Sequence, residues 1–174
     1  INTPTYELEI PSTGKKIKYR PFLVREEKIL VMALETEDMG QISNAIVEIL
    51  SACINTRGVK VQELAMFDIE YLFLNVRAKS VGEKIDVTVT CPDDGETQVQ
   101  TEIDIDTIRV QKDKDHTNII KLDDTLSMKL KYPSMDQFVE NNFEIEGDGG
   151  VDQSLEMISS CIEMIYNDDE CWSA

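Results

Sequence analysis

The stretch from residue 64 to residue 91, LAMFDIEYLFLNVRAKSVGEKIDVTVTC, constrains the fold of this chain more than any other. In its first half, apolar residues recur every three or four positions and cover most of a helix's circumference, which predicts a helix buried on several sides. Gly82 is suited to end this helix, because glycine adopts the conformation of a helix C-terminus without strain. In the second half, apolar and polar residues alternate from Ile85 to Cys91, which predicts a half-buried strand. We therefore expect a central buried helix that leads directly into a sheet packed on it.

The residues that follow predict an antiparallel hairpin. An Asp-Gly turn lies within residues 92–96, and this dipeptide favours a tight connection between two strands. Beyond the turn, residues alternate in character from residue 97 to residue 103, with Val99, Thr101 and Ile103 on the inner face. We expect this segment to pair with residues 84–91.

A second hairpin is predicted near the N-terminus. Two short alternating segments, residues 6–10 and 16–20, are separated by Pro-Ser-Thr-Gly, which favours a turn. The hairpin is expected at the edge of a sheet, because its lysines would discourage further strand pairing.

Two amphipathic helices are predicted between this hairpin and the central helix. The first spans residues 24–35, and its apolar stripe is expected to face the core. Its charged residues are expected to face water; they are Arg25, Glu26, Glu27 and Lys28. The second helix spans residues 42–53, and either Asp38 or Ser43 is suited to cap its N-terminus.

The remainder of the chain alternates between strand and helix signals. Residues 120–122 and 126–132 predict two strands, and Ser134 is expected to cap a short helix after them. Glycines and acidic residues predict a flexible acidic loop over residues 144–152. A last helix is predicted over residues 152–166.

The apolar stripe of this last helix comprises Leu155, Ile158, Ile162 and Ile165. If nothing covers the stripe, we expect either self-association through this region or a disordered end after Asn167. A homo-oligomer is therefore one alternative for the chain.

Together these elements predict an α+β fold. It would combine a helical N-terminal half with an edge hairpin, a central buried helix, a mostly antiparallel sheet and a C-terminal helix. A length of 174 residues fits a single domain over residues 1–174. The chain begins with Ile1 rather than methionine, so this domain is also compatible with a fragment of a longer protein.

The charge balance excludes two classes of partner. The chain has 34 acidic and 17 basic residues, which give a formal net charge of -17. Without a basic excess it is not expected to bind nucleic acid through phosphates or to adhere to an anionic membrane. Its apolar runs are also shorter than the roughly 18 residues that a membrane-spanning helix needs. We therefore expect the partners to be proteins whose surface patches complement this acidic charge.

The sequence predicts no metal site and no cofactor. The four cysteines are Cys53, Cys91, Cys161 and Cys171, with no CxxC spacing; buried free thiols are favoured over a disulfide pair. His116 is the only histidine, which is too few for a typical zinc site. A calcium loop that started at Glu146 would place Met157 where the bidentate glutamate belongs. Neither Gly14 nor Gly82 lies in a phosphate-binding loop sequence.

No catalytic residue is predicted either. His116 lies in the charged segment KDKDHTN, which is typical of a solvated loop rather than of a positioned base. Adjacent or nearly adjacent aspartates recur along the chain and are typical of solvated turns; they are Asp93, Asp94, Asp104, Asp106, Asp123, Asp124, Asp168 and Asp169. We therefore expect the chain not to be an enzyme.

Two stretches carry a resemblance. Residues 11–28, PSTGKKIKYRPFLVREEK, and residues 67–83, FDIEYLFLNVRAKSVGE, resemble the baseplate protein family of T-even (T-four-like) myoviruses and their marine relatives. The resemblance is to a baseplate hub subunit, or a hub assembly protein, and it covers nearly the whole chain. The resemblance implies a marine phage member. Members of that family continue beyond the equivalent of Tyr166, so the chain is expected to be either a fragment that is truncated at its C-terminus or a short variant.

This resemblance implies a structural or assembly role in the contractile tail. The chain would bind other phage baseplate or tail proteins, and it would be found in the virion or in the host cytoplasm during assembly. An assembly chaperone absent from the virion is one alternative. A metal-dependent hydrolase that uses clustered carboxylates is another, and an acidic mimic of DNA would need a regular carboxylate spacing that the chain lacks.

Overall fold

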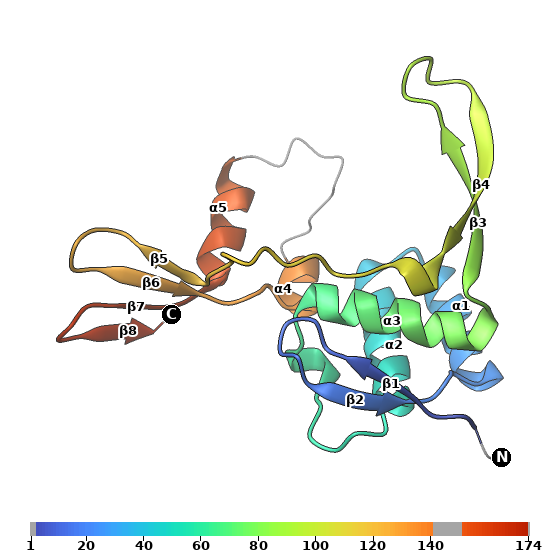
Figure 1. The fold of residues 1–174 in the computed structure, drawn as a ribbon, viewed down its shortest axis with the longest axis horizontal. Coiled ribbons are helices and arrows are strands. Elements are labelled where there is room, and N and C mark those ends of the chain that lie inside the picture. Colours follow the sequence, from blue (N-terminus) through green and yellow to red (C-terminus); the bar gives the residue numbers. More distant parts are fainter. Residues whose placement is uncertain (1–2, 141–150, 174) are drawn as a thin grey trace.

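The computed structural model describes residues 3–140 and 151–173 of the chain (Figure 1). The helices are α1 (Val24–Leu34), α2 (Met39–Cys53), α3 (Met66–Val81), α4 (Met135–Glu140) and α5 (Val151–Ser160), with short 3-10 turns η1 (Val61–Glu63) and η2 (Ile105–Thr107). The strands are β1 (Tyr6–Glu9), β2 (Lys16–Tyr19), β3 (Lys84–Thr90), β4 (Gln98–Asp104), β5 (Ile119–Lys121), β6 (Ser127–Leu130), β7 (Ile162–Tyr166) and β8 (Cys171–Ser173).

All strand pairs among the described residues are antiparallel. Strands β1 and β2 form one two-stranded sheet, β3 and β4 form another, and a four-stranded sheet has the order β5-β6-β7-β8. The described residues combine helices with sheets that are antiparallel throughout, which confirms the predicted α+β class.

The hydrophobic core lies where α2, α3 and the β1–β2 hairpin meet. Its buried side chains are Ile10, Ile17, Tyr19, Ile49, Leu50, Cys53, Val61, Ile69, Leu72, Val76 and Met135. The predicted hairpin at residues 6–20 is confirmed, and β2 also contacts the chain after α2, since the Asn55 amide donates to the Lys18 carbonyl at 2.7 Å. One face of this hairpin therefore completes the core.

The predicted central helix is confirmed. Along α3 only Glu70 and Val81 are exposed, whereas Ile69, Leu72 and Val76 are fully buried. Gly82 ends the helix with a positive φ of 135°, a conformation that a side chain would disfavour. The helix is therefore packed against neighbouring elements along most of its length. Residues 3–83 and α4, which together contain the hydrophobic core, are called the body from here on.

A buried carboxylate joins the N-terminal end of α3 to the β1–β2 turn. The Asp68 side chain is fully buried, and it accepts a hydrogen bond of 2.9 Å from the Ser12 amide and another from the Ser12 hydroxyl. A buried carboxylate is stable only when such donors replace its water. This contact fixes the first hairpin across the start of the central helix.

The predicted packing of the second hairpin on the central helix is wrong. Strands β3 and β4 form the expected antiparallel hairpin, with Val89 opposite Val99 and Ile85 opposite Ile103. The hairpin, however, rises from the end of α3 and projects away from the body (Figure 1). Alternation predicts which side chains share a face, but it does not reveal whether that face is covered.

The predicted orientation of one α1 residue is also wrong. Glu26 was expected to face water, yet only 2% of it is exposed. Its carboxylate accepts hydrogen bonds from Arg20 at 3.1 Å and from the Leu23 amide at 2.6 Å. The helix prediction itself is confirmed over Val24–Leu34, and Asp38 caps α2 by accepting from the Gln41 amide.

The predicted last helix ends early. The helix α5 stops at Ser160, and Ile162–Tyr166 forms the strand β7 between β6 and β8. The apolar spacing fits a helix, but the β-branched and aromatic residues of this segment pair well with a neighbouring strand. Because Cys171–Ser173 forms β8, the disordered end expected after Asn167 is also wrong.

The predicted strands and short helix before this region are confirmed as β5, β6 and α4. Ser134 caps α4 as expected, because its hydroxyl accepts from the Gln137 amide at 3.3 Å. Most of the predicted flexible loop over residues 144–152 lies outside the described residues, and its last two residues begin α5.

Candidate functional site

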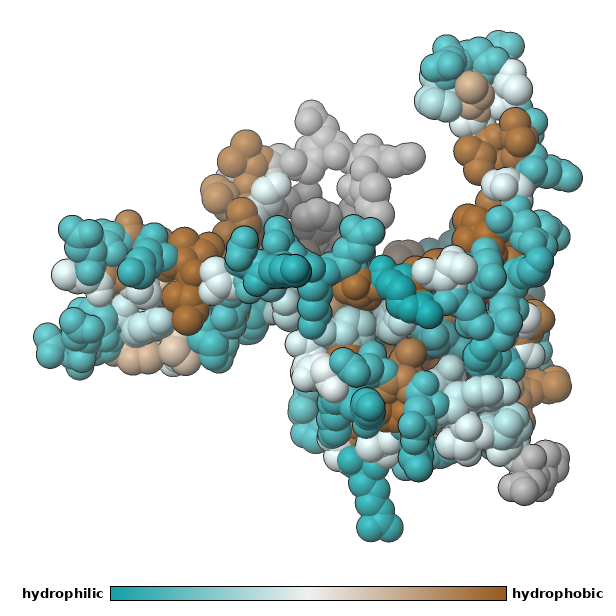
Figure 2. Space-filling view, in the orientation of Figure 1, coloured by the Kyte–Doolittle hydropathy of each residue, from teal (hydrophilic) through white to brown (hydrophobic). Residues whose placement is uncertain are grey.

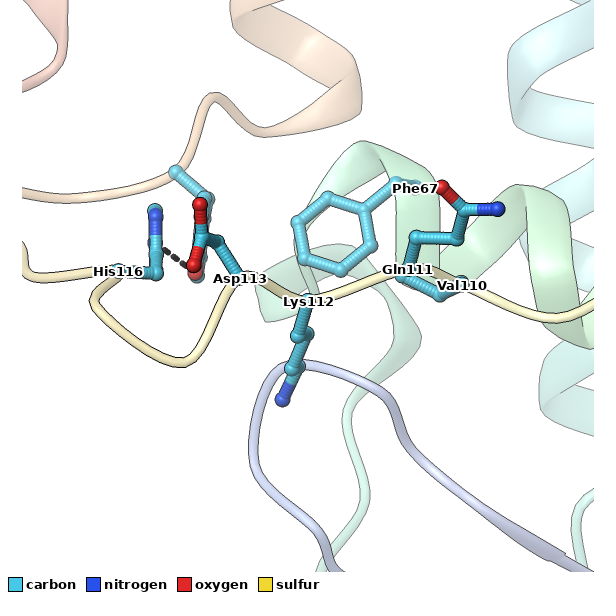
Figure 3. Close-up of a pocket in the computed structure, with 7 residues that line it drawn as sticks. Phe67, Val110, Gln111, Lys112, Asp113 and His116 are labelled. Atoms are coloured by element: carbon cyan, nitrogen blue, oxygen red, sulfur yellow. Dashed lines mark hydrogen bonds between the residues drawn. The ribbon is translucent and has the colours of Figure 1, made fainter.

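A small cavity lies where the chain crosses from the β3–β4 hairpin to the four-stranded sheet (Figure 3). Its volume is about 250 Å³, and it is lined by Phe67, Val110, Gln111, Lys112, Asp113, His116 and Tyr132. Phe67 comes from the first turn of α3, and residues 110–113 pass beside it as irregular chain before a turn at residues 114 and 115 leads to His116. The cavity is therefore built mainly from one irregular crossover segment and the aromatic side chains of Phe67 and Tyr132.

Aromatic contacts hold this crossover in place. The rings of Phe67 and Tyr132 meet edge to face with centroids 4.9 Å apart. The His116 ring stacks on Tyr132 at 6.0 Å, and its Nε2 atom lies 2.8 Å from the Tyr132 hydroxyl. The sequence predicted a freely solvated histidine; it is exposed, but it has a fixed partner that sequence spacing alone could not reveal.

The contacts of His116 fit a role in positioning the crossover better than a role in catalysis. A histidine that acts as a base is normally oriented by a third group on its other ring nitrogen. Among residues 3–140 and 151–173, the His116 ring has only Tyr132 as a side-chain hydrogen-bond partner. The His116–Tyr132 pair therefore resembles a packing contact, and the sequence-based expectation of no catalytic residue stays a prediction.

Of the aspartates predicted in turns, those at positions 93, 94, 123, 124, 168 and 169 occupy turns or bends, whereas Asp104 ends β4 and Asp106 lies in η2 and pairs with Lys79. Asp94 accepts hydrogen bonds from the Thr97 hydroxyl and from the amides of Thr97 and Glu96, which hold the pKa of Asp94 at about 2. Asp123 accepts from the amides of Thr125 and Leu126, and these bonds lower its pKa. Such carboxylates stabilise loops and do not converge on a shared proton.

Potential metal ligands are dispersed. Within the described parts of the chain, no three His, Cys, Asp or Glu side chains form a group that could hold an ion. The four cysteines are free thiols at separate places: Cys53 is buried, Cys91 and Cys161 are half-buried, and Cys171 is exposed. Burial raises the pKa of the Cys53 thiol to about 11.

Of the helices described, none is long and apolar enough to cross a membrane.

The β3–β4 hairpin, residues 84–104, is the most distinctive surface and is called the arm from here on. Its two faces differ in chemistry. The apolar face carries Ile85, Val87, Val89, Val99, Thr101 and Ile103, and the opposite face carries Lys84, Asp86, Thr88, Thr90, Gln98, Gln100, Glu102 and Asp104. Exposed fractions of 50% for Val89 and 56% for Val99 show that the described residues leave this face largely uncovered. Apolar residues are visible along the arm in Figure 2.

The base of the arm is fixed to the body. Ile105, directly after β4, is buried, and its amide donates to the Glu83 carbonyl at 2.8 Å. Lys79, in the last turn of α3, contacts both Glu83 and Asp106, with its Nζ atom 2.9 Å from Asp106 Oδ2. Hydrogen bonds with these two carboxylates raise the pKa of Lys79. The arm therefore starts from a defined position on the end of the central helix.

A second apolar surface lies on α5. Val151, Leu155 and Ile158 are 56% to 76% exposed, although they share one side of the helix. The predicted uncovered stripe is confirmed at Leu155 and Ile158, and it is wrong at Ile162 and Ile165, which are half-buried in β7. Exposed apolar groups that gather on one element are typical of surfaces that bind other proteins.

Comparison with known proteins identifies one protein family. A protein-family model described as "T4 bacteriophage base plate protein" matches residues 3–174. A search of curated proteins and a search of solved structures each returned no match. The family match covers nearly the whole sequence, including the arm, the central helix and the four-stranded sheet. This chain therefore belongs to the T4 bacteriophage base plate protein family.

Proposed function

We propose that this protein is a subunit or an assembly factor of the baseplate hub and that it acts by binding other baseplate proteins. Membership of the family indicates a structural or assembly role in the phage baseplate. The narrower assignment to the hub, and to a marine phage, is supported by the resemblance carried by residues 11–28 and 67–83.

The observation that carries this proposal is the uncovered apolar face of the arm. The body has a core whose central side chains are completely buried, such as Ile69 and Leu72. The arm lies outside that core and still keeps a strict alternation of apolar and polar residues. Because the core does not use this apolar face, a contact with another protein accounts for it.

The acidic charge supports proteins as partners rather than nucleic acids or membranes. A net charge of -17 repels phosphates and anionic lipid headgroups, so nucleic acid and membranes are not proposed as ligands. It also favours rapid association with basic protein surfaces. Exposed apolar residues on α5 provide a second surface through which a multi-protein assembly could hold this subunit.

Binding to individually purified baseplate proteins from the same phage genome tests the proposal. We expect a stable complex with at least one of them, detected by size-exclusion chromatography with light scattering. Absence of any complex with the full set would contradict a role based on protein contacts. Mass spectrometry of purified virions then separates a resident hub subunit, which would be present, from an assembly chaperone, which would be absent.

A further inference from the structure

We propose that the apolar face of the arm is the docking surface for a baseplate protein whose own surface presents an apolar strip flanked by Lys and Arg residues. This inference rests on the proposed function and assigns it to one place in the fold. It concerns a partner protein of opposite charge and not a second copy of this chain.

The first argument is the placement of the apolar residues. Cross-strand pairing puts Ile85 with Ile103 and Val89 with Val99 on one face of a twisted ribbon. Ile103 is 42% exposed, and Val89 and Val99 are exposed by half or more. A face of this kind offers an extended apolar strip, which is the part of an interface that becomes fully buried.

The second argument is that the arm is long for an unsupported hairpin. Seven residue pairs connect β3 to β4, and the described hydrogen bonds and ion pairs that join the hairpin to α3 and η2 are made at its base, through Glu83, Ile105 and Asp106. An isolated two-stranded hairpin is only marginally stable in water. Burial of its apolar face against a partner would add the stabilisation that the body does not supply.

The third argument is electrostatic. Between residues 84 and 104 there are six acidic side chains and one basic side chain, Lys84, which already pairs with Glu102 at 2.6 Å. Acidic groups lie at the tip of the arm, at Asp93, Asp94 and Glu96, next to the end of the apolar strip. Further carboxylates on the opposite face add to the negative field around the arm. A basic partner complements this surface, whereas a second copy would bring a net charge of -17 against the same negative charge.

The decisive variant removes apolar contact and keeps strand geometry. V89T/V99T replaces valine with threonine, which has nearly the same shape and a high strand preference but a polar hydroxyl. T88V/Q100T is the matched control, because it alters a directly opposed pair on the other face and places a β-branched residue at both positions. Unchanged melting temperatures and circular dichroism would show that both variants fold like the parent chain.

The measurement is the Kd for each purified baseplate protein of the same genome that binds the unaltered chain. We expect V89T/V99T to raise the Kd by about tenfold or more and T88V/Q100T to change it by less than about twofold. A complex that V89T/V99T leaves intact would overturn the docking assignment while the proposed function stands. If no baseplate protein binds the unaltered chain, both proposals fail together.

A charge variant tests the chemistry of the partner separately. D86N/D93N/E96Q removes three carboxylates of the arm whose side chains accept no described hydrogen bond, and it leaves the apolar face unchanged. We expect the association rate to fall about fivefold or more, and the binding of the unaltered chain to weaken between about 50 mM and 500 mM salt. Binding that is insensitive to both changes would contradict a basic partner. Self-association that is lost in V89T/V99T would identify a second copy as the occupant and would likewise overturn the proposal.

Discussion

Lys79 Nζ lies 2.9 Å from Oδ2 of Asp106, and this ion pair joins the last turn of the central helix to the 3-10 turn that follows the arm. Lys79 also contacts Glu83, the residue directly before β3. One lysine therefore holds both ends of the hairpin. The amide of Ile105 reinforces this closure by donating to the Glu83 carbonyl.

Replacement of Lys79 by methionine should loosen the base of the arm while the body stays folded. Methionine keeps an apolar chain of similar length but cannot pair with Asp106 or Glu83. Because ion pairs near a surface are weak, we expect the Ile105 amide to exchange with solvent about two- to fivefold faster. Hydrogen exchange followed by mass spectrometry measures this change. Lys84→Met, which breaks a pair on the arm itself, is the control and should leave Ile105 unaffected.

Glu26 gives the fold a defined acid sensitivity. Burial alone would raise the pKa of Glu26, but hydrogen bonds from Arg20, the Leu23 amide and Arg25 together lower it. A folded-state pKa below the unfolded value stabilises the fold above the unfolded pKa, about 4.3, and this contribution is lost as the pH falls further.

Glu26→Gln should therefore lower the free energy of unfolding at neutral pH by about 1.5–3 kcal/mol, because charge-assisted hydrogen bonds are lost in a buried site. The variant should also lose less stability than the parent between about pH 5 and pH 3. Urea unfolding at several pH values measures both effects. Glu27→Gln, at an exposed neighbouring position, is the control. Identical acid sensitivity in the parent and in Glu26→Gln would show that this carboxylate does not contribute.

Asp68 should be important for the position of the first hairpin. Asp68→Ala removes both acceptors of the Ser12 hydrogen bonds, so we expect the free energy of unfolding to fall by about 1.5–3 kcal/mol. Chemical denaturation provides the measurement. Glu70→Ala lies on the exposed side of the same helix and should change stability by less than about 0.5 kcal/mol. Equal effects of the two substitutions would contradict the structural role of Asp68.

The four thiols should differ widely in reactivity. The Cys53 thiol is buried and its pKa is about 11, so at pH 8 its thiolate fraction is about a hundredfold below that of an ordinary cysteine. Cys171 is exposed and should react first with a thiol reagent. Mass spectrometry of the folded chain at timed intervals identifies the labelled residue. Labelling of Cys53 as fast as Cys171 would show that the core opens readily.

The raised pKa of Cys53 also has a consequence at alkaline pH. The folded state keeps the proton where the unfolded chain has already released it. The contribution to stability is therefore fully present below the unfolded pKa, and it is lost as the pH rises toward about 11.

The sequence was most informative where local periodicity decides the outcome. The central helix, its end at Gly82 and the antiparallel pairing of the arm all follow from the spacing of neighbouring residues. Such spacing fixes which side chains share a face. It does not fix what covers that face, which is why the projection of the arm from the body was not predicted.

Other features depended on contacts between distant or competing elements. Glu26 is buried because the end of β2 brings Arg20 against α1, although a glutamate at the third position of a helix is a known capping signal that could have indicated its bond to Leu23. Residues 162–166 have apolar spacing that fits a helix, but β6 and β8 provide strand partners on both sides. The His116–Tyr132 contact spans 16 positions and has no local signal.

The central claim is that this protein is required for the baseplate through its contacts with other baseplate proteins. The most direct measurement is electron microscopy of tail structures made by a phage that lacks the gene, with the protein supplied from a plasmid. The account predicts that complete baseplates are absent without the plasmid, restored by the unaltered protein and not restored by V89T/V99T. Normal baseplates and normal infectivity in the absence of the protein would contradict it.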